Sequence, residues 1–345
     1  MPNYTTINKS TDHFNTITYT GSGTSTAYTV GFPTDFVWIK KRDTEAAAHY
    51  LFNKISGTEK AVYSNLSNAE ETNANSVTSF DANGFTSGSS GGTNQSGHGF
   101  VSWNWLAGGT ASSNTDGSIT SSVSANTTAG FSIVSYTGTG SAATVGHGLG
   151  AVPKFMFIKN LSAAESWRIY HQSLGNATSM KLNTSDASFS DSGAFNSTTP
   201  TSTLFTVGNS DSTNKSGDSI IAYCFAEKKG FSKFGSYSGN GSADGTFVYT
   251  GFKPAWLIIR KTSAAGSWYM YDNKRPGYNS TQANSDALIA DGTDPEFTSN
   301  IDLVSNGFKI RTSGIGENHS GESFIYMTFA ESPLVGTNNV PCTAR

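Results

Sequence analysis

The segment from Gly88 to Gly92 is the part of the chain that best fits a nucleophile motif, because it reads Gly-x-Ser-x-Gly. In hydrolases this spacing places a serine on a sharp turn between a strand and a helix. Here the segment lies in a low-complexity stretch of Ser and Gly, with no apolar strand pattern before it and no helical pattern after it. The spacing therefore predicts a loop and not an active site.

The residue types that bind metals or transfer protons are scattered along the chain. The six histidines form no His-Glu-x-x-His pattern, and Cys224 and Cys342 form no close pair. His147 and His171 lack matched carboxylates, so we expect surface or turn roles for them. Glycoside hydrolysis needs two carboxylates beside a cleft, and the acidic residues here are sparse and mostly do not recur in register. We predict no enzymatic activity, no catalytic residues, no metal and no cofactor.

Two aromatic pairs with identical spacing are the best candidates for ligand contacts. Trp167 is followed by Tyr170, and Trp268 by Tyr271. Exposed Trp and Tyr rings can stack on sugars or anchor a protein interface. Alternatively, the rings fill a sandwich core, where aromatic side chains supply most of the buried area. We favour a core or subunit interface and keep glycan contact as the alternative.

Three sequence blocks recur three times in the same order, which indicates an internal repeat. The first is Tyr-Ser/Thr-Gly-x-Gly and begins at Tyr19, Tyr136 and Tyr237. The second is an apolar run, and the third begins with Asn-x-Ser-Gly and ends in another apolar run. The second-block runs are 36–40, 155–159 and 256–260, and the third-block runs are 100–105, 220–225 and 324–329.

These apolar runs have the character of strands, because they are short, rich in β-branched and aromatic residues and bounded by glycine-containing turns. The closing runs 220–225 and 324–329 are apolar on both faces, as expected of a central strand between two layers. No segment has a sustained helical period. The pattern predicts an all-β chain of three tandem antiparallel β-sandwich domains.

The repeats set the predicted domain boundaries. Each copy is long enough to bury its own core, and the connection between the first two is polar and rich in Gly and Ser, so it could be flexible. Lys40 and Arg260, which follow the second-block strand, are expected to be solvated strand ends or to meet an acidic patch on a neighbouring subunit. The boundaries are 1–12 for an N-terminal arm, 13–108 for repeat 1, 109–116 for a linker, 117–229 for repeat 2, 230–333 for repeat 3 and 334–345 for a C-terminal tail.

Composition argues against several classes of partner. The chain has 345 residues, 14% charged residues and a formal net charge of -3, so it has no basic excess with which to neutralise nucleic-acid phosphates. No apolar stretch approaches the length of roughly 20 residues that spans a bilayer, and the first ten residues have no signal-peptide pattern. We therefore expect neither nucleic-acid binding nor membrane insertion. The two cysteines fit assembly in a reducing cytosol.

The chain resembles a family of marine bacteriophage proteins that are usually called tail-fibre or virion structural proteins. The resemblance covers roughly residues 13–345 and is carried by the segments 101–109, 117–121, 146–153, 251–256, 306–311 and 340–345. It implies jelly-roll or concanavalin-A-like lectin sandwiches. One departure is the short stretch before the first copy, where long fibres usually have an N-terminal tail-attachment domain.

We expect the chain to be a structural component of a bacteriophage virion, assembled in the host cytoplasm, that presents lectin-like repeats on the particle surface. A tail fibre, a head fibre and a capsid decoration protein all fit. The expected partners are other virion proteins and further copies of the chain, with a trimer as one candidate. The alternative is a glycan-binding module that recognises a host-surface glycan, and a polysaccharide depolymerase is the third hypothesis.

Overall fold

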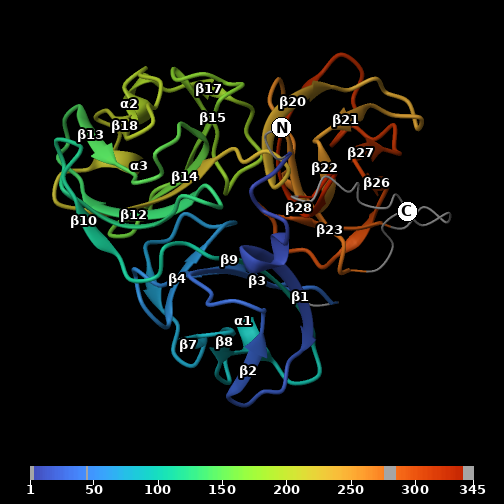
Figure 1. The fold of residues 1–345 in the computed structure, drawn as a ribbon, viewed down its shortest axis with the longest axis horizontal. Coiled ribbons are helices and arrows are strands. Elements are labelled where there is room, and N and C mark those ends of the chain that lie inside the picture. Colours follow the sequence, from blue (N-terminus) through green and yellow to red (C-terminus); the bar gives the residue numbers. More distant parts are fainter. Residues whose placement is uncertain (1–3, 44–45, 276–284, 337–345) are drawn as a thin grey trace.

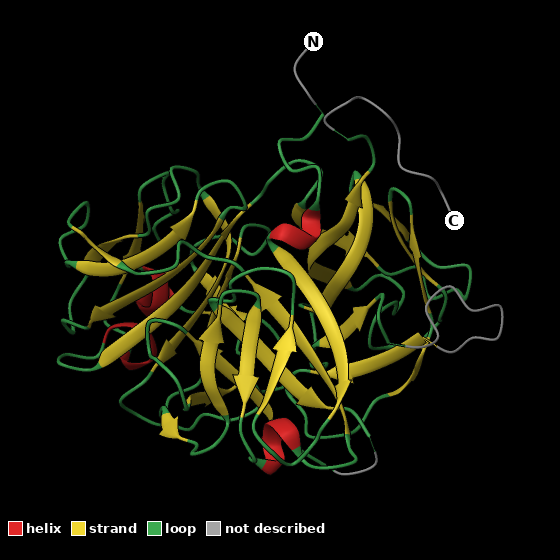
Figure 2. Cartoon of the chain, turned by 60° about the horizontal axis from the view of Figure 1, so that its bottom comes forward, coloured by secondary structure: helices red, strands yellow, loops and turns green. Residues whose placement is uncertain are grey.

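The computed structural model describes residues 4–43, 46–275 and 285–336. Figure 2 shows that the described chain is almost entirely strand, with a few short helices. The strands form three six-stranded sheets and several smaller ones, and every ladder between them is antiparallel. The expectation of an all-β sandwich fold is confirmed.

Each sequence repeat forms one lobe of the structure. Lobe 1, formed by the first repeat, pairs a large sheet of order β1-β9-β3-β4-β5-β6 with a small sheet of order β2-β8-β7. The two sheets enclose the lobe's own apolar cluster, which includes Val37, Phe52 and Phe85. The elements are η1 (Ser10–Asp12), β1 (Phe14–Thr20), β2 (Thr26–Thr29), β3 (Phe36–Lys41), β4 (His49–Asn53), β5 (Lys60–Tyr63), β6 (Glu71–Thr72), β7 (Val77–Asp81), β8 (Gly84–Ser87), α1 (Gly91–Asn94) and β9 (Gly99–Trp105).

Lobe 2 has the large-sheet order β10-β11-β12-β19-β14-β15, and its second layer contains the pair β13-β18. A further short pair, β16-β17, lies beside β15 of the large sheet. The elements are β10 (Ser112–Asn114), β11 (Ser121–Asn126), β12 (Phe131–Thr137), β13 (Ala143–Gly146), β14 (Pro153–Asn160), β15 (Arg168–His171), β16 (Thr178–Ser179), β17 (Phe189–Ser190), α2 (Ser192–Phe195), β18 (Leu204–Val207), α3 (Asp211–Asn214) and β19 (Ser219–Ala226).

Lobe 3 has the large-sheet order β20-β28-β22-β23-β24-β25, and its small sheet has the order β21-β27-β26. The elements are β20 (Ser232–Ser238), β21 (Phe247–Tyr249), β22 (Phe252–Lys261), β23 (Tyr269–Asp272), β24 (Ser285–Ile289), β25 (Phe297–Ser299), β26 (Ile301–Val304), β27 (Gly307–Ile310) and β28 (Ser323–Pro333).

The closing apolar run of each repeat is a central strand, β9, β19 or β28, with a neighbour on each side. Successive side chains on a strand point to opposite faces, and in β19 both faces are buried. Tyr223 and Phe225 face a cluster shared by all three lobes, whereas Ala222 and Cys224 face the cluster of lobe 2 alone. This double burial explains why the run is continuously apolar instead of alternating.

The expectation of one core for each repeat is incomplete, because the three lobes also share a central core. Figure 1 shows the lobes around a common centre, with lobe 1 in blue below, lobe 2 in green and yellow on the left and lobe 3 in orange and red on the right. One aromatic cluster holds side chains from every lobe, among them Trp103, Trp105, Tyr223, Trp256 and Phe329. The large sheets are therefore the middle layers of the molecule, between a lobe core and the central core.

A backbone hydrogen bond recurs at each boundary between lobes. In every case the amide belongs to the residue directly before a short strand of one lobe, β6, β17 or β25, and the acceptor carbonyl directly follows the second-block strand of the next lobe. The bonds are Glu70 N to Leu161 O at 2.9 Å, Ser188 N to Thr262 O at 3.1 Å and Glu296 N to Arg42 O at 3.0 Å. Lobe 1 thus contacts lobe 2, lobe 2 contacts lobe 3, and lobe 3 returns to lobe 1, so the contacts form a closed ring.

The segments outside the repeats are also packed. The predicted linker 109–116 contains β10, which pairs with β11, and Gly108 N donates to Ser124 Oγ at 2.9 Å, so a flexible linker is wrong. In the N-terminal arm, Ile7 is buried in the shared core and Tyr4 Oη donates to Gly251 O at 2.7 Å in lobe 3. Most of the predicted C-terminal tail, including Cys342, lies outside the described residues.

The shared core predicts that the chain unfolds as one cooperative unit. Replacing Tyr223 with Ala removes a ring that is completely buried in the central cluster, and we expect the free energy of unfolding to fall by about 3–5 kcal/mol. Differential scanning calorimetry should show a single transition that moves to lower temperature in the variant. Separate transitions, or a variant in which lobes 1 and 3 keep the wild-type stability, would contradict the shared core.

Candidate functional site

The four aromatic residues singled out from the sequence are all buried. The exposed fraction is 0% for Trp167 and Trp268, 3% for Tyr170 and 1% for Tyr271. Their rings cannot stack on a glycan, so the glycan-contact alternative is wrong for these residues. They lie in the core and at the boundaries between lobes of one chain, because the tandem lobes cover one another's sheets.

The two tryptophans each donate a hydrogen bond across a lobe boundary. Trp167 Nε1 in lobe 2 donates to Tyr63 O in lobe 1 at 2.8 Å, and Trp268 Nε1 in lobe 3 donates to Lys181 O in lobe 2 at 2.9 Å. Strand register puts the two acceptors at equivalent places. Tyr63 pairs opposite Tyr50, which follows His49, and Lys181 follows Met180, which is bridged to Ile169 two residues after Trp167. A buried indole N–H needs an acceptor, and here the neighbouring lobe supplies it.

His49 occupies the equivalent position in lobe 1 and completes the set. Its Nδ1 accepts a hydrogen bond from Trp38 Nε1 at 2.9 Å, so the proton of the neutral ring is on Nε2. Nε2 lies 2.9 Å from Ile289 O in lobe 3 and donates to it. Burial of the imidazole holds the pKa of His49 well below its ordinary value. A neutral histidine therefore closes the ring where the other lobes use tryptophan.

A second set of hydrogen bonds between lobes involves the last residues of β4, β15 and β23. Asn53 Nδ2 donates to Tyr223 Oη at 3.1 Å, and His171 Nε2 lies 3.3 Å from Tyr326 O. At the boundary between lobes 3 and 1 the direction is reversed, since Trp103 Nε1 donates to Asp272 Oδ2 at 3.1 Å. Each boundary thus has two such side-chain hydrogen bonds, and at the boundary of lobes 3 and 1 lobe 1 donates both of them.

The boundary between lobes 1 and 3 also carries buried charges. Glu296 accepts from Arg42 at 2.7 Å and lies 3.6 Å from Arg275, whose Nε donates to Asp272 at 2.7 Å. The side chains of Arg275 and Asp272 are at most 1% exposed. Burial alone raises the pKa of Asp272, but Arg275 outweighs it and lowers the pKa below its ordinary value. The network keeps the charges paired where the chain's first and last lobes meet.

The basic residues that follow the second-block strand are buried, so the expectation of solvated strand ends is wrong. Lys40 is completely buried and its Nζ donates to Ala47 O at 2.8 Å and to Thr293 O of lobe 3 at 3.0 Å. Arg260 is completely buried too and donates to Asp186 O of lobe 2. Each of the two side chains therefore reaches an acceptor in a neighbouring lobe of the same chain, which the sequence does not reveal.

The repeated Asn-x-Ser-Gly and Tyr-x-Gly-x-Gly blocks of each lobe are joined by hydrogen bonds. Asn214 Oδ1 accepts from Thr139 N at 2.8 Å, and its Nδ2 donates to Ser141 O and Gly208 O, both at 2.6 Å. The equivalent asparagines in the other lobes, Asn94 and Asn318, make the corresponding bonds. These asparagines are completely buried, and their hydrogen bonds fix the conformation of the turn. We call each of them a structural pin in this sense.

The first glycine of the Tyr-x-Gly-x-Gly block is required by a close approach of two backbones. A Cβ at Gly21, Gly138 or Gly239 would lie 2.1–2.2 Å from the carbonyl oxygen of the residue after the buried asparagine. No side chain fits at such a distance, so only glycine allows the turn and the asparagine to meet. The block that best reveals the repeat is therefore a packing requirement.

The Gly-x-Ser-x-Gly segment has more regular surroundings than the sequence indicates, since β8 precedes it and the four-residue helix α1 begins within it at Gly91. Ser90 has φ −60° and ψ 129°, an unstrained extended conformation, and its Oγ donates to Asn73 Oδ1 at 2.9 Å. In lobe 2, Ser210 precedes α3 with φ −72° and ψ 129°. The same conformation in two lobes indicates a structural role that leads the chain into the buried asparagine.

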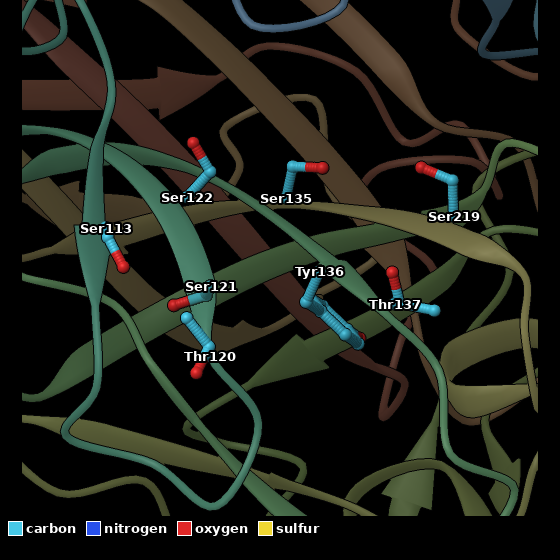
Figure 3. Close-up of a pocket in the computed structure, with 8 residues that line it drawn as sticks. All are labelled: Ser113, Thr120, Ser121, Ser122, Ser135, Tyr136, Thr137 and Ser219. Atoms are coloured by element: carbon cyan, nitrogen blue, oxygen red, sulfur yellow. The ribbon is translucent and has the colours of Figure 1, made fainter.

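A hollow of about 350 Å³ lies on lobe 2 and is lined almost entirely by hydroxyl groups (Figure 3). Ser113, Ser122 and Ser135 lie side by side on β10, β11 and β12, because they are register partners. A similar hollow of about 280 Å³ on lobe 3 includes Ser236, the counterpart of Ser135. Hydroxyl groups can donate hydrogen bonds to a neutral polar ligand and accept them from it, but the lining of neither hollow includes a charged side chain.

One exposed feature was missed by the sequence analysis. Phe247 and Tyr249 on β21 are 46% and 49% exposed, whereas most aromatic side chains of the described chain are buried. The register equivalents are Ala27 and Thr29 on β2 and Thr144 and Gly146 on β13. Alignment of the three copies at this strand could have found the difference, because the two aromatic residues occur in one copy only.

Among residues 4–43, 46–275 and 285–336, no group of three or more His, Cys, Asp and Glu side chains is arranged to hold a metal ion. Of the surface or turn roles expected for His147 and His171, the surface role is wrong, since both side chains are completely buried. Each ring does accept a hydrogen bond from the backbone amide two residues further on. The described part of the chain also has no helix whose length and apolar character would allow it to cross a membrane.

Comparison with known proteins gives one family. A family model described as a domain of unknown function (DUF7483) matches residues 9–333. This match begins next to η1, ends with β28 and includes all three lobes. The search of curated proteins found no match. Since one family model spans the whole ring, the ring is the unit that the family model describes.

Replacing Asn214 with Ala leaves the amide of Thr139 and the carbonyls of Ser141 and Gly208 without their buried partner. We expect a loss of about 3 kcal/mol in the free energy of unfolding, measured by guanidinium denaturation. As a control, Asn68→Ala at an exposed position should change it by less than about 0.5 kcal/mol. Equal effects of the two variants would show that the buried asparagine is not a pin.

Stability should fall as the pH drops from about 6.5 towards 4 because of buried histidine. Burial lowers the pKa of His171 to about 4, so in this range the unfolded chain binds a proton that the folded chain excludes. The full effect of one such group is about 3 kcal/mol. Above pH 6.5 both states are neutral at this residue, and it adds no slope.

His171→Asn, which installs the residue that lobe 1 has at this position, should reduce the dependence of the unfolding free energy on pH between 6.5 and 4. Urea denaturation at a series of pH values measures it. His319→Asn, whose side chain is 49% exposed, is the matched control and should keep the wild-type slope. An unchanged slope in His171→Asn would contradict the assignment.

Proposed function

The chain belongs to the DUF7483 family, and from this premise we propose that it is a structural component of a bacteriophage virion that presents the three-lobed ring on the particle surface. A tail fibre, a head fibre or a capsid decoration protein would use it in this way. Assembly takes place in the host cytoplasm, and the partners are other virion proteins and further copies of the chain, with a trimer as one candidate.

The observation that carries the proposal is the closed ring of equivalent lobe boundaries. Each boundary repeats a backbone hydrogen bond and side-chain hydrogen bonds over a common aromatic core. The residues that recur in the sequence are used for packing and turns, so the repeats build a surface and not a reaction centre. A rigid body of this kind suits a part that must stay folded outside the cell, and the sequence resemblance to virion proteins points the same way.

Recognition of a host-surface glycan is the second candidate function. Trp167 and Trp268 are buried and cannot serve it. The exposed Phe247 and Tyr249 on β21 favour it, because aromatic rings at a surface can stack on sugars. The two functions are compatible, since a particle surface protein can also be the part that touches the host.

The particle role predicts that the chain sediments with intact phage. Particles purified by density gradient should contain it in a fixed ratio to the major capsid protein, and gold-labelled antibody should mark one part of the particle in electron micrographs. A phage replication enzyme measured in the same gradient is the negative control. A chain that stays with that control in the soluble fraction, with unlabelled particles, would refute the virion role.

A further inference from the structure

Lobe 3 carries a row of aromatic rings on its outer surface. β21 is an edge strand of the small sheet, and its three residues alternate in direction. Val248 points inward and belongs to the core of lobe 3, whereas Phe247 and Tyr249 point outward and are about half exposed. Opposite Tyr249 stands Gly307, which has no side chain to cover the ring.

Tyr4 extends this row from a distant part of the sequence. Its Oη donates to Gly251 O at 2.7 Å. A Cβ placed on Gly251 would lie 2.8 Å from the Tyr4 hydroxyl and 3.5 Å from the Tyr249 hydroxyl. The two tyrosines therefore meet over Gly251, and the row runs from Phe247 through Tyr249 to Tyr4. We call these three side chains the lobe 3 aromatic row.

The fold does not require this row. The equivalent outward positions are Ala27 and Thr29 in lobe 1 and Thr144 and Gly146 in lobe 2, although β2 and β13 pair in the same register as β21. Small or polar residues thus satisfy the same strand twice. Exposed aromatic rings that folding does not need indicate a contact with another molecule.

Two lysines give the row a positive charge. Lys229 Nζ lies 4.5 Å from the centre of the Tyr4 ring, and Lys233 Nζ lies 5.6 Å from that of Tyr249. In the described part of the chain, neither ammonium group makes an ion pair with a carboxylate. Beyond Phe247 the charges are balanced, because Lys309 and Arg311 are paired with Asp244 and Asp302. The uncompensated charge is confined to the tyrosine end.

We propose that the lobe 3 aromatic row binds an acidic polysaccharide, with sugar rings stacked on Phe247 and Tyr249 and a uronate carboxylate on Lys229 and Lys233. This rests on the glycan-recognition candidate and not on the virion role. The charge complementarity selects an anionic sugar over a neutral one.

The dimensions of the row favour a glycan over a protein partner. Two half-exposed aromatic side chains and the more covered Tyr4 offer an area on the order of 300 Å² at most, whereas a standard protein interface buries roughly 800 Å² on each partner. Lysine is also depleted in the centre of protein interfaces. A linear polymer that lies along a strip of rings needs no larger surface.

The test uses the full chain and oligogalacturonate, with maltohexaose as the neutral probe, in isothermal titration calorimetry. The double variant Phe247→Ala/Tyr249→Thr installs the residues that lobe 1 has at these positions, so the sheet should fold unchanged. Leu66→Ala removes an exposed apolar side chain from lobe 1 and is the matched control. Lys233→Gln tests the charge separately, and thermal unfolding confirms that each variant is folded.

The expected result is saturable binding of oligogalacturonate, weaker at high salt, and little binding of maltohexaose. The double variant should lose about tenfold or more in affinity, an effect that corresponds to about 1.4 kcal/mol, and Leu66→Ala should bind like the wild type.

Three outcomes would overturn the proposal. They are no binding of oligogalacturonate by the wild type, equal binding by wild type and double variant, and a wild-type dimer in sedimentation that the double variant abolishes, which would assign the row to a second copy of the chain. Because the soluble chain is used, each outcome is independent of whether the chain is found in particles.

Discussion

The structure depends on one buried N–H donor in each lobe, at or directly before the start of β4, β15 or β23, which donates to a backbone carbonyl of a neighbouring lobe. Trp167 and Trp268 donate from indole, and His49 donates from a neutral imidazole. A buried donor without an acceptor is costly, so these three donors are satisfied only when the neighbouring lobe is in place. This requirement fixes how the large sheets meet and allows their inner faces to be apolar.

The closed ring explains why so much of the repeated sequence is structural. The tyrosine, glycine and asparagine blocks build the same turn three times, and the closing runs are apolar on both faces because each lies between two cores. Repetition therefore marks what the ring requires. The best candidates for function are the places where the three lobes differ.

Two such differences stand out. The boundary between lobes 1 and 3 carries an ion-pair network, formed by Arg42, Glu296, Arg275 and Asp272. Among the described residues, the other two boundaries have no comparable set of ion pairs. The network joins the beginning of the chain to its end. The aromatic row of lobe 3 is the other difference, and unlike the charged network it faces outward.

The strands, the turns and the threefold repetition could be predicted from the sequence, because period-two burial, β-branched runs and glycine spacing act over a few residues. It did not determine which surfaces are covered. Trp167, Lys40 and His171 are buried by side chains and carbonyls from another lobe. In each case the hydrogen-bond acceptor is more than a hundred residues away along the chain. Phe247 is an aromatic residue like Trp167, but no lobe of the described chain covers its ring, which is 46% exposed. Burial of an aromatic or basic side chain depends on how segments distant in the sequence are arranged, and this arrangement is visible in the tertiary structure alone.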